Sequence, residues 1–78
     1  MIESLSMDNL TRGEKAVVRE VTSPGSIRRR LMDIGLVEGT VVECIGKSPF
    51  GDPSAFQIKG AVIALRREDA NTIKIESL

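Results

Sequence analysis

Carboxylate and arginine side chains supply most of the chemistry that this sequence offers. Divalent metals favour imidazole and carboxylate ligands, but the chain contains no histidine and its 11 Asp and Glu residues are scattered. The one adjacent acidic pair, Glu68–Asp69, falls in a polar turn, where neighbouring side chains diverge and water competes for a metal. We therefore expect a solvated surface pair here, and the sequence predicts no metal site and no cofactor.

Arginines are concentrated at residues 28–30. Arginine binds carboxylates and phosphates through two parallel hydrogen bonds and is enriched at protein interfaces. The alternative is a solvated helix flank, on which the arginine stems cover apolar surface and Arg29 or Arg30 pairs with Asp33. We take Arg28 and Arg29 as candidate partner-binding residues and leave both interpretations open.

A compact loop at residues 48–53 holds two prolines, one glycine, Phe50 and Asp52. Phe50 either closes one end of the core or anchors a partner, because an aromatic side chain on a proline-stiffened loop loses little entropy on binding. We add Phe50 and Asp52 to the candidate partner-binding residues.

The single cysteine, Cys44, lies in a valine-rich run. A reactive thiol needs a lowered pKa or neighbouring ligands, and the adjacent sequence supplies neither, so we expect a small buried apolar side chain. One cysteine forms no internal disulfide, which is typical of a reducing compartment and predicts a cytoplasmic location. Without histidine or a phosphate-binding glycine motif, the sequence predicts that the protein is not an enzyme.

Length and composition restrict the remaining classes. The chain has 78 residues, which fits a single domain spanning residues 1–78. Its 11 basic and 11 acidic residues cancel, and only two residues are aromatic, so no nucleic-acid partner is expected. The longest apolar run, residues 61–65, is far shorter than the roughly 20 residues that span a membrane.

The apolar pattern predicts a small five-stranded β-barrel with one short helix. Ile27, Leu31 and Ile34 share one helical face, and Gly35 ends the helix. Residues 67–71 are expected to form a polar helical turn, and residues 1–9 to be loosely ordered, with Leu5 and Leu10 tucked against the body. The predicted strands are residues 15–22, 40–46, 55–59, 61–66 and 72–76. The predicted inward side chains are Phe56, Ile58, Ile73 and Ile75. In residues 40–46, Val42 and Cys44 share one face and Val41 and Ile45 the other; both faces are apolar, which predicts a central or strongly curved strand.

Three segments taken together resemble the FeoA (ferrous iron transport protein A) family. They are the L-x-x-G-E motif at residues 10–14, RRRLMDIGLVEGTVVECI at residues 28–45, and SPFGDPSAFQIKGAVIALRREDANTIKI at residues 48–75. The resemblance implies an SH3-like barrel with a helix inserted after the first strand. It also implies a cytosolic accessory role beside FeoB, the membrane ferrous iron transporter with an N-terminal GTP-binding domain.

The fold prediction is therefore mainly β, a small SH3-like five-stranded barrel with one short inserted helix. The functional prediction is a protein–protein interaction module, monomeric or weakly oligomeric, that binds and supports or regulates a FeoB-type transporter. Two alternatives remain open. One is a nucleic-acid-binding small barrel, favoured by the arginine run at residues 28–30 together with Arg66 and Arg67. The other is a metal-sensing SH3-like regulatory domain, by analogy with the C-terminal domain of iron-dependent repressors.

Overall fold

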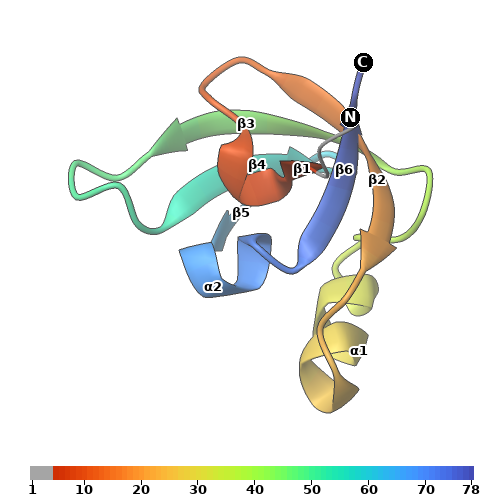
Figure 1. Cartoon of the computed structure of the whole chain (residues 1–78). Coiled ribbons are helices and arrows are strands. Elements are labelled where there is room, and N and C mark those ends of the chain that lie inside the picture. Colours follow the sequence, from red (N-terminus) through yellow and green to blue (C-terminus); the bar gives the residue numbers. More distant parts are fainter. Residues whose placement is uncertain (1–4) are drawn as a thin grey trace.

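The computed structural model describes residues 5–78, which form one antiparallel six-stranded sheet in the order β1-β6-β2-β3-β4-β5 (Figure 1). A 3₁₀ helix, η1 (Met7–Asn9), and two α-helices, α1 (Gly25–Asp33) and α2 (Arg67–Ala70), interrupt the strands. The strands are β1 (Leu5–Ser6), β2 (Lys15–Val21), β3 (Val41–Lys47), β4 (Ser54–Ile58), β5 (Ala61–Leu65) and β6 (Ile73–Ser77).

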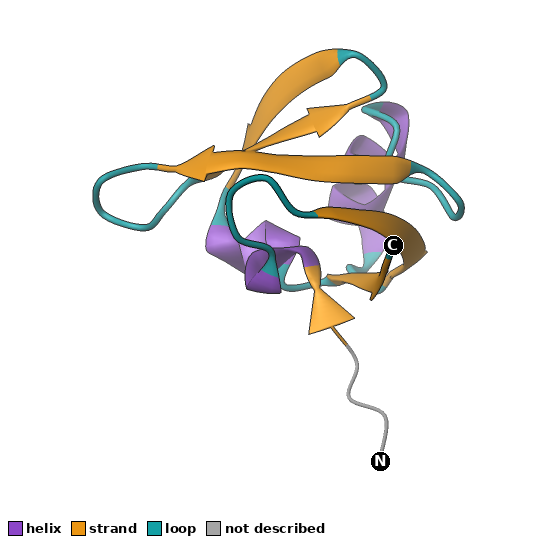
Figure 2. Ribbon diagram, turned by 90° about the horizontal axis from the view of Figure 1, so that it is seen from above, coloured by secondary structure: helices purple, strands orange, loops and turns teal. Residues whose placement is uncertain are grey.

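The sheet is strongly coiled, and the strands cross over one another when seen from above (Figure 2). Two register shifts help to bend it. One lies between Val18 and Glu20, where β2 pairs with β6, and the other between Cys44 and Gly46, where β3 pairs with β4. Such bulges increase local twist and bend the strand. The mainly-β prediction with one short helix after the first long strand is confirmed, and the structure adds a sixth strand, β1.

Alternation along the strands builds the core. Side chains that alternate on a strand point to opposite faces of the sheet, and here every second residue of the long strands turns inward. Burying one such side chain, for example Phe56, contributes about 1.5–3 kcal/mol relative to leaving it exposed. The four predicted inward residues are all buried: Phe56, Ile58, Ile73 and Ile75. In β3 the Val42 and Cys44 face is the buried one, whereas Val41 and Ile45 are exposed.

The prediction of a loosely ordered N-terminal segment is wrong for residues 5–9, while residues 1–4 lie outside the described part of the chain. Leu5 pairs with Ile75 in the sheet, and Met7 is fully buried. The Ser6 amide donates a hydrogen bond to the Asn9 side chain at 2.9 Å. The segment is mostly polar, so its sequence did not indicate that Met7 is buried. Burial of this side chain packs the segment against the core. Leu10 is buried, as predicted.

Helix α1 is held mainly by one residue. Leu31 is buried and Ile34 packs against the core, whereas Ile27, predicted on the same face, is largely exposed. The helix ends at Asp33, and two residues later comes Gly35, whose φ of +110° lies in a region that other residues rarely adopt. A Cβ on Gly35 would lie 3.2 Å from Ile58 and 3.1 Å from the stem of Lys59. Backbone conformation and packing thus both require glycine there.

We expect Gly35→Ala to lower the free energy of unfolding by roughly 1–3 kcal/mol, because it combines a strained φ with a close contact. Urea denaturation followed by circular dichroism measures the change. Gly46→Ala is the matched control, since Gly46 has no positive φ and open space around its Cβ position. Equal stability of Gly35→Ala and Gly46→Ala would contradict this account of the helix end.

Candidate partner-binding site

The loop at residues 48–53 is fixed by its own hydrogen bonds. The Ser48 hydroxyl donates to the carbonyl of Asp52 at 2.8 Å and accepts from the amide of Asp52 at 3.1 Å. The amide of Gly51 donates to the carbonyl of Ser48 at 2.8 Å, and the amide of Ser48 donates to the carbonyl of Pro53 at 3.0 Å. The loop therefore presents its outer side chains from an ordered backbone.

Phe50 points into solvent from this loop. Its exposed fraction is 93%, so it does not close the end of the core. The interpretation that Phe50 closes one end of the core is therefore wrong, and the interpretation as a partner anchor is left. An aromatic side chain this exposed is unusual on a small domain, and such residues are common anchors at interfaces.

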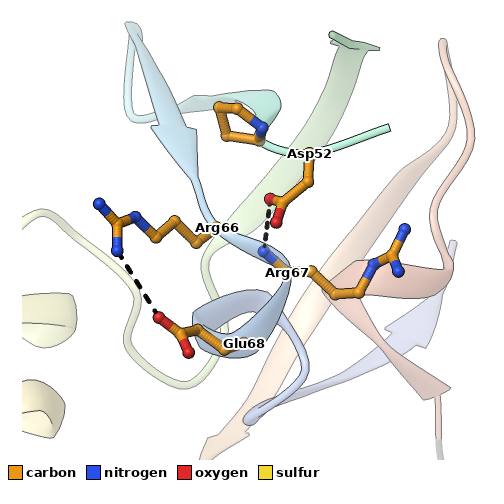
Figure 3. Close-up of a pocket in the computed structure, with 5 residues that line it drawn as sticks. Asp52, Arg66, Arg67 and Glu68 are labelled. Carbon is orange, nitrogen blue, oxygen red and sulfur yellow. Dashed lines mark hydrogen bonds and ion pairs between the residues drawn. The ribbon is translucent and has the colours of Figure 1, made fainter. Parts of the chain in front are cut away.

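Asp52 ties the loop to α2. Its Oδ1 accepts a hydrogen bond from the backbone amide of Arg67, the first residue of α2, at 2.9 Å (Figure 3). The first amides of a helix lack partners within the helix, and Arg66, which precedes α2, offers no side-chain cap. Asp52 thus caps α2 although it lies in a different part of the sequence. The same hydrogen bond holds the loop in position, so Asp52 is a positioning residue for the loop.

Two arginines border the same surface. Arg66 pairs with Glu68 at 3.8 Å and Arg67 pairs with Asp8 at 3.7 Å, while their side chains remain 76% and 61% exposed. Ion pairs of this length and exposure contribute little to stability. Both guanidinium groups therefore remain available to a carboxylate or phosphate of a partner.

We call this region the loop–α2 surface, defined by Phe50, Asp52, Arg66, Arg67 and Glu68. The last four residues, with Pro53, line an open hollow of about 650 Å³. Figure 3 shows the side chains of Arg66 and Arg67 directed to opposite sides of the start of α2. The hollow thus combines a capped helix start with two cationic side chains.

Arg28 and Arg29 do not join this surface. They lie on α1, at the lower right of Figure 1, whereas the loop at residues 48–53 lies at the far left. The Arg28 side chain turns toward β2 and donates to the carbonyl of Val21 at 3.4 Å. The expected local pairing with Asp33 is replaced for Arg30 by an ion pair with Asp69 of α2 at 3.6 Å.

The acidic pair Glu68–Asp69 diverges, as predicted, because each carboxylate faces a different arginine. Glu68 is well exposed, but the side chain of Asp69 is only 16% exposed beneath Arg30, so the expectation of a solvated pair is wrong for Asp69. Within residues 5–78, no three His, Cys, Asp or Glu side chains gather as potential metal ligands. Nor does any described helix combine the length and the apolar character needed to cross a membrane.

Cys44 lies in the core, as predicted. Burial is the main cause that raises the pKa of its thiol, because the charged thiolate is poorly solvated there. The thiolate is the nucleophilic and metal-binding form of cysteine. The neutral thiol therefore acts as an apolar core side chain.

This shift predicts a pH dependence of stability. A thiol whose folded pKa is raised above its usual value of about 8.5 contributes stability that is complete below that pH. The contribution is lost as the pH rises through the raised pKa. Between about pH 8 and pH 10, we expect the free energy of unfolding to fall more steeply for the wild type than for Cys44→Ala. Urea titrations at several pH values measure the two slopes, and parallel slopes would refute the assignment.

A family model for the FeoA domain matches residues 5–77. The chain belongs to the FeoA family. This family is involved in ferrous iron transport. The family resemblance inferred from the sequence is therefore confirmed.

Three relatives show how far the similarity extends. An Fe(2+) transport protein A/Fe(2+) transporter FeoB fusion protein of Porphyromonas gingivalis is 32% identical over 72 residues, which are 92% of this chain but 8% of the fusion. An FeoA-like protein from Clostridium acetobutylicum superposes with a TM-score of 0.89 at 32% identity, covering 100% of this chain and 91% of that one. The FeoA of Stenotrophomonas maltophilia, solved with zinc and described as an SH3 domain protein, gives 0.83 at 29% identity, covering 92% and 89%.

These relatives confirm the SH3-like fold of this FeoA-family chain. The sequence suggested the loop residues Phe50 and Asp52 as candidates, which stay a prediction, but did not assign Arg66 and Arg67 to the same surface. The signal that could have placed them was topological. In the six-stranded order, the turn after β5 lies beside the loop that precedes β4, because β4 and β5 are paired with Ser54 opposite Leu65.

Removing the Asp52 carboxylate tests the link between the loop and α2. We expect Asp52→Ala to cost about 0.5–2 kcal/mol of stability, as for other lost helix caps, and to speed hydrogen exchange at the Arg67 amide. Asp52→Asn is the matched control, because its amide oxygen can still accept that hydrogen bond. Exchange at Arg67 that is unchanged in Asp52→Ala would argue against the cap.

Proposed function

We propose that this chain is a protein–protein interaction module that docks on the cytosolic side of a FeoB-type ferrous iron transporter and supports or regulates it. The module is not an enzyme in this proposal. The observation that carries it is the Porphyromonas gingivalis relative, whose name joins an FeoA part and a FeoB part in one polypeptide.

A fusion of this kind favours association through effective concentration. Two linked modules meet at an effective concentration in the millimolar range when the linker is short and flexible. The present chain spans about a twelfth of that fusion. Linked or not, association also requires a contact surface on the FeoA part.

The loop–α2 surface has the properties of such a contact. Phe50 provides a large apolar group on a hydrogen-bonded loop, so little conformational entropy is lost when it is buried. Arg66 and Arg67 line the hollow beside this loop with weakly paired guanidinium groups. The complementary partner surface is an apolar pocket with carboxylates at its rim.

Regulation in this proposal is a shift between states of the transporter. A bound module favours whichever state it binds more tightly, by the ratio of its two affinities. The Stenotrophomonas maltophilia relative, suggested to act as a ferrous iron transport activating factor, points in the same direction. Arg28 and Arg29 would form a second, separate contact along α1, since they lie far from Phe50.

Truncating Phe50 is the sharpest test. We expect Phe50→Ala to leave stability unchanged, because the side chain is exposed, and to weaken binding to the full transporter by roughly thirtyfold, as expected of a central interface residue. Fluorescence anisotropy with the labelled chain and detergent-solubilised transporter measures the affinity, with a GTP analogue and then with GDP. The matched control is Leu78→Ala, another exposed apolar residue, which lies at the chain end.

Two outcomes would overturn this proposal. Equal affinities of Phe50→Ala and Leu78→Ala would remove the loop from the contact. An absence of binding to the transporter, together with nucleic-acid binding whose logarithm falls steeply with the logarithm of salt concentration, would instead support a nucleic-acid-binding barrel. An affinity that differs between the two nucleotides would favour regulation over a scaffold role.

A further inference from the structure

We propose that the free edge of β5 is a second docking site, which pairs with an extended apolar segment of another protein flanked by acidic residues. The bound segment would add one strand to the sheet beyond β5. This site adjoins the loop–α2 surface, because Arg66 and Glu68 line both hollows, but it is centred on β5, and the inference does not depend on the transporter proposal. It rests on the hydrogen-bonding pattern of β5, on the groove beside it and on the charges at its ends.

The register of β5 leaves two residues with unused backbone groups. Lys59 and Gly60 form a two-residue turn with φ values of +48° and +85°, which is typical of a type I′ hairpin. Directly beyond such a turn, paired residues exchange hydrogen bonds, and these pairs alternate with pairs that do not. Ala61, Ile63 and Leu65 therefore bond to β4, and the amides and carbonyls of Val62 and Ala64 point away from it.

Within residues 5–78, no other segment is hydrogen-bonded to those outward groups. Val62 is 64% exposed, and Ala61 and Ala64 are also exposed. Natural edge strands are usually protected by a charge, a proline or a bulge. The strand β5 has none of these, and its register with β4 is regular. At the other edge of the sheet, β1 has only two residues.

A groove beside β5 would accept the side chains of an added strand. It runs between β5 and α1, with a volume of about 540 Å³, and its apolar lining includes Ile27 of α1, Ile34 just after α1, and Ile63 and Leu65 of β5. Its rim is polar and includes the Arg30–Asp69 ion pair. Alternate side chains of an extended segment point to the same face. In a segment hydrogen-bonded to Val62 and Ala64, every second side chain would therefore point into this groove, where apolar side chains fit. Backbone pairing combined with side-chain pockets is how proteins recognise peptides by strand addition.

The charges near the ends of β5 favour an acidic segment of another protein over a second copy of this chain. From residue 53 to residue 67 the chain carries Lys59, Arg66 and Arg67 and no acidic residue. A second copy paired antiparallel about Ile63 would bring the turn residue Lys59 of one copy toward Arg66 and Arg67, just beyond β5 in the other copy, at both ends of the added ladder, and like charges brought close repel each other. A segment of another protein with carboxylates at both ends would meet cations instead.

A synthetic peptide tests the site directly. The probe alternates valine and threonine between paired glutamates, and the control peptide carries paired lysines in their place. Hydrogen exchange of the full chain, followed by NMR, reports each amide. At saturating probe we expect exchange at the Val62 and Ala64 amides to slow by roughly tenfold or more, while the Ile63 amide, already bonded to β4, changes little. We expect the lysine peptide to bind roughly tenfold more weakly.

Two changes to the hydrogen bonds complete the test. Ala64→Pro removes an outward amide that β4 does not use, an arrangement that edge strands tolerate, and should weaken binding by about tenfold with the amide spectrum otherwise retained. Ala64→Ser, which keeps the amide, is the matched control. Should Ala64→Pro lose its folded spectrum, a probe N-methylated at its valines removes the same class of bond from the peptide side and must bind about tenfold more weakly.

Four results would overturn the proposal. In the first, millimolar probe does not slow exchange at the Val62 and Ala64 amides. In the second and third, the glutamate and lysine peptides bind equally well, or the N-methylated probe binds as tightly as the unmethylated one. In the fourth, the two amides become protected as the protein concentration rises, without any peptide. The last result would mean that a second copy of this chain occupies the edge.

Discussion

The pairing of β2 with β6 is the interaction on which the rest of the molecule depends. It joins an early segment to the last strand, with Val21 opposite Ile73. The two helices follow from it, because α1 starts where β2 ends and α2 finishes where β6 begins. The bond from the Thr22 amide to the Thr72 carbonyl, at 2.8 Å, continues the pairing beyond the ladder. Both helices are thus held at one end of the sheet, and the groove between α1 and β5 is the space that remains.

Several core residues could be predicted from the sequence, because apolar residues recur at every second position of the strands. Phe56 and Ile58 could be assigned to the core because alternation in a strand depends only on neighbouring residues. Contacts between distant segments could not be assigned in this way. The sequence gives no reason why Arg30 should pair with Asp69 rather than Asp33, or why Asp52 should cap α2. The exposure of Phe50 and the burial of Met7 likewise depend on the assembled barrel and not on local pattern.

The two proposed surfaces differ in the physics of recognition. The loop–α2 surface offers side chains, namely one exposed aromatic ring and two guanidinium groups, and suits a partner with a preformed pocket. The edge of β5 offers main-chain groups, which any extended segment can meet, so that its selectivity must come from the groove and the terminal charges. Arg66 lies where the two surfaces meet, since it follows β5 and lines both hollows. A domain of this size buries only roughly 60% of its chain surface, so much of it remains available for contacts.

Gly35 has a mechanical consequence. Because this residue has no side chain, Ile58 and the stem of Lys59 approach the end of α1 closely, within 3.1–3.2 Å of where a Cβ would stand. Ile58 ends β4 and Lys59 begins the turn of the β4–β5 hairpin. The hairpin and the end of α1, which belong to the two sides of the groove, therefore approach each other at Gly35. Any larger residue at this position would push the hairpin away from the helix, so the absence of one side chain sets how closely the two sides of the groove approach.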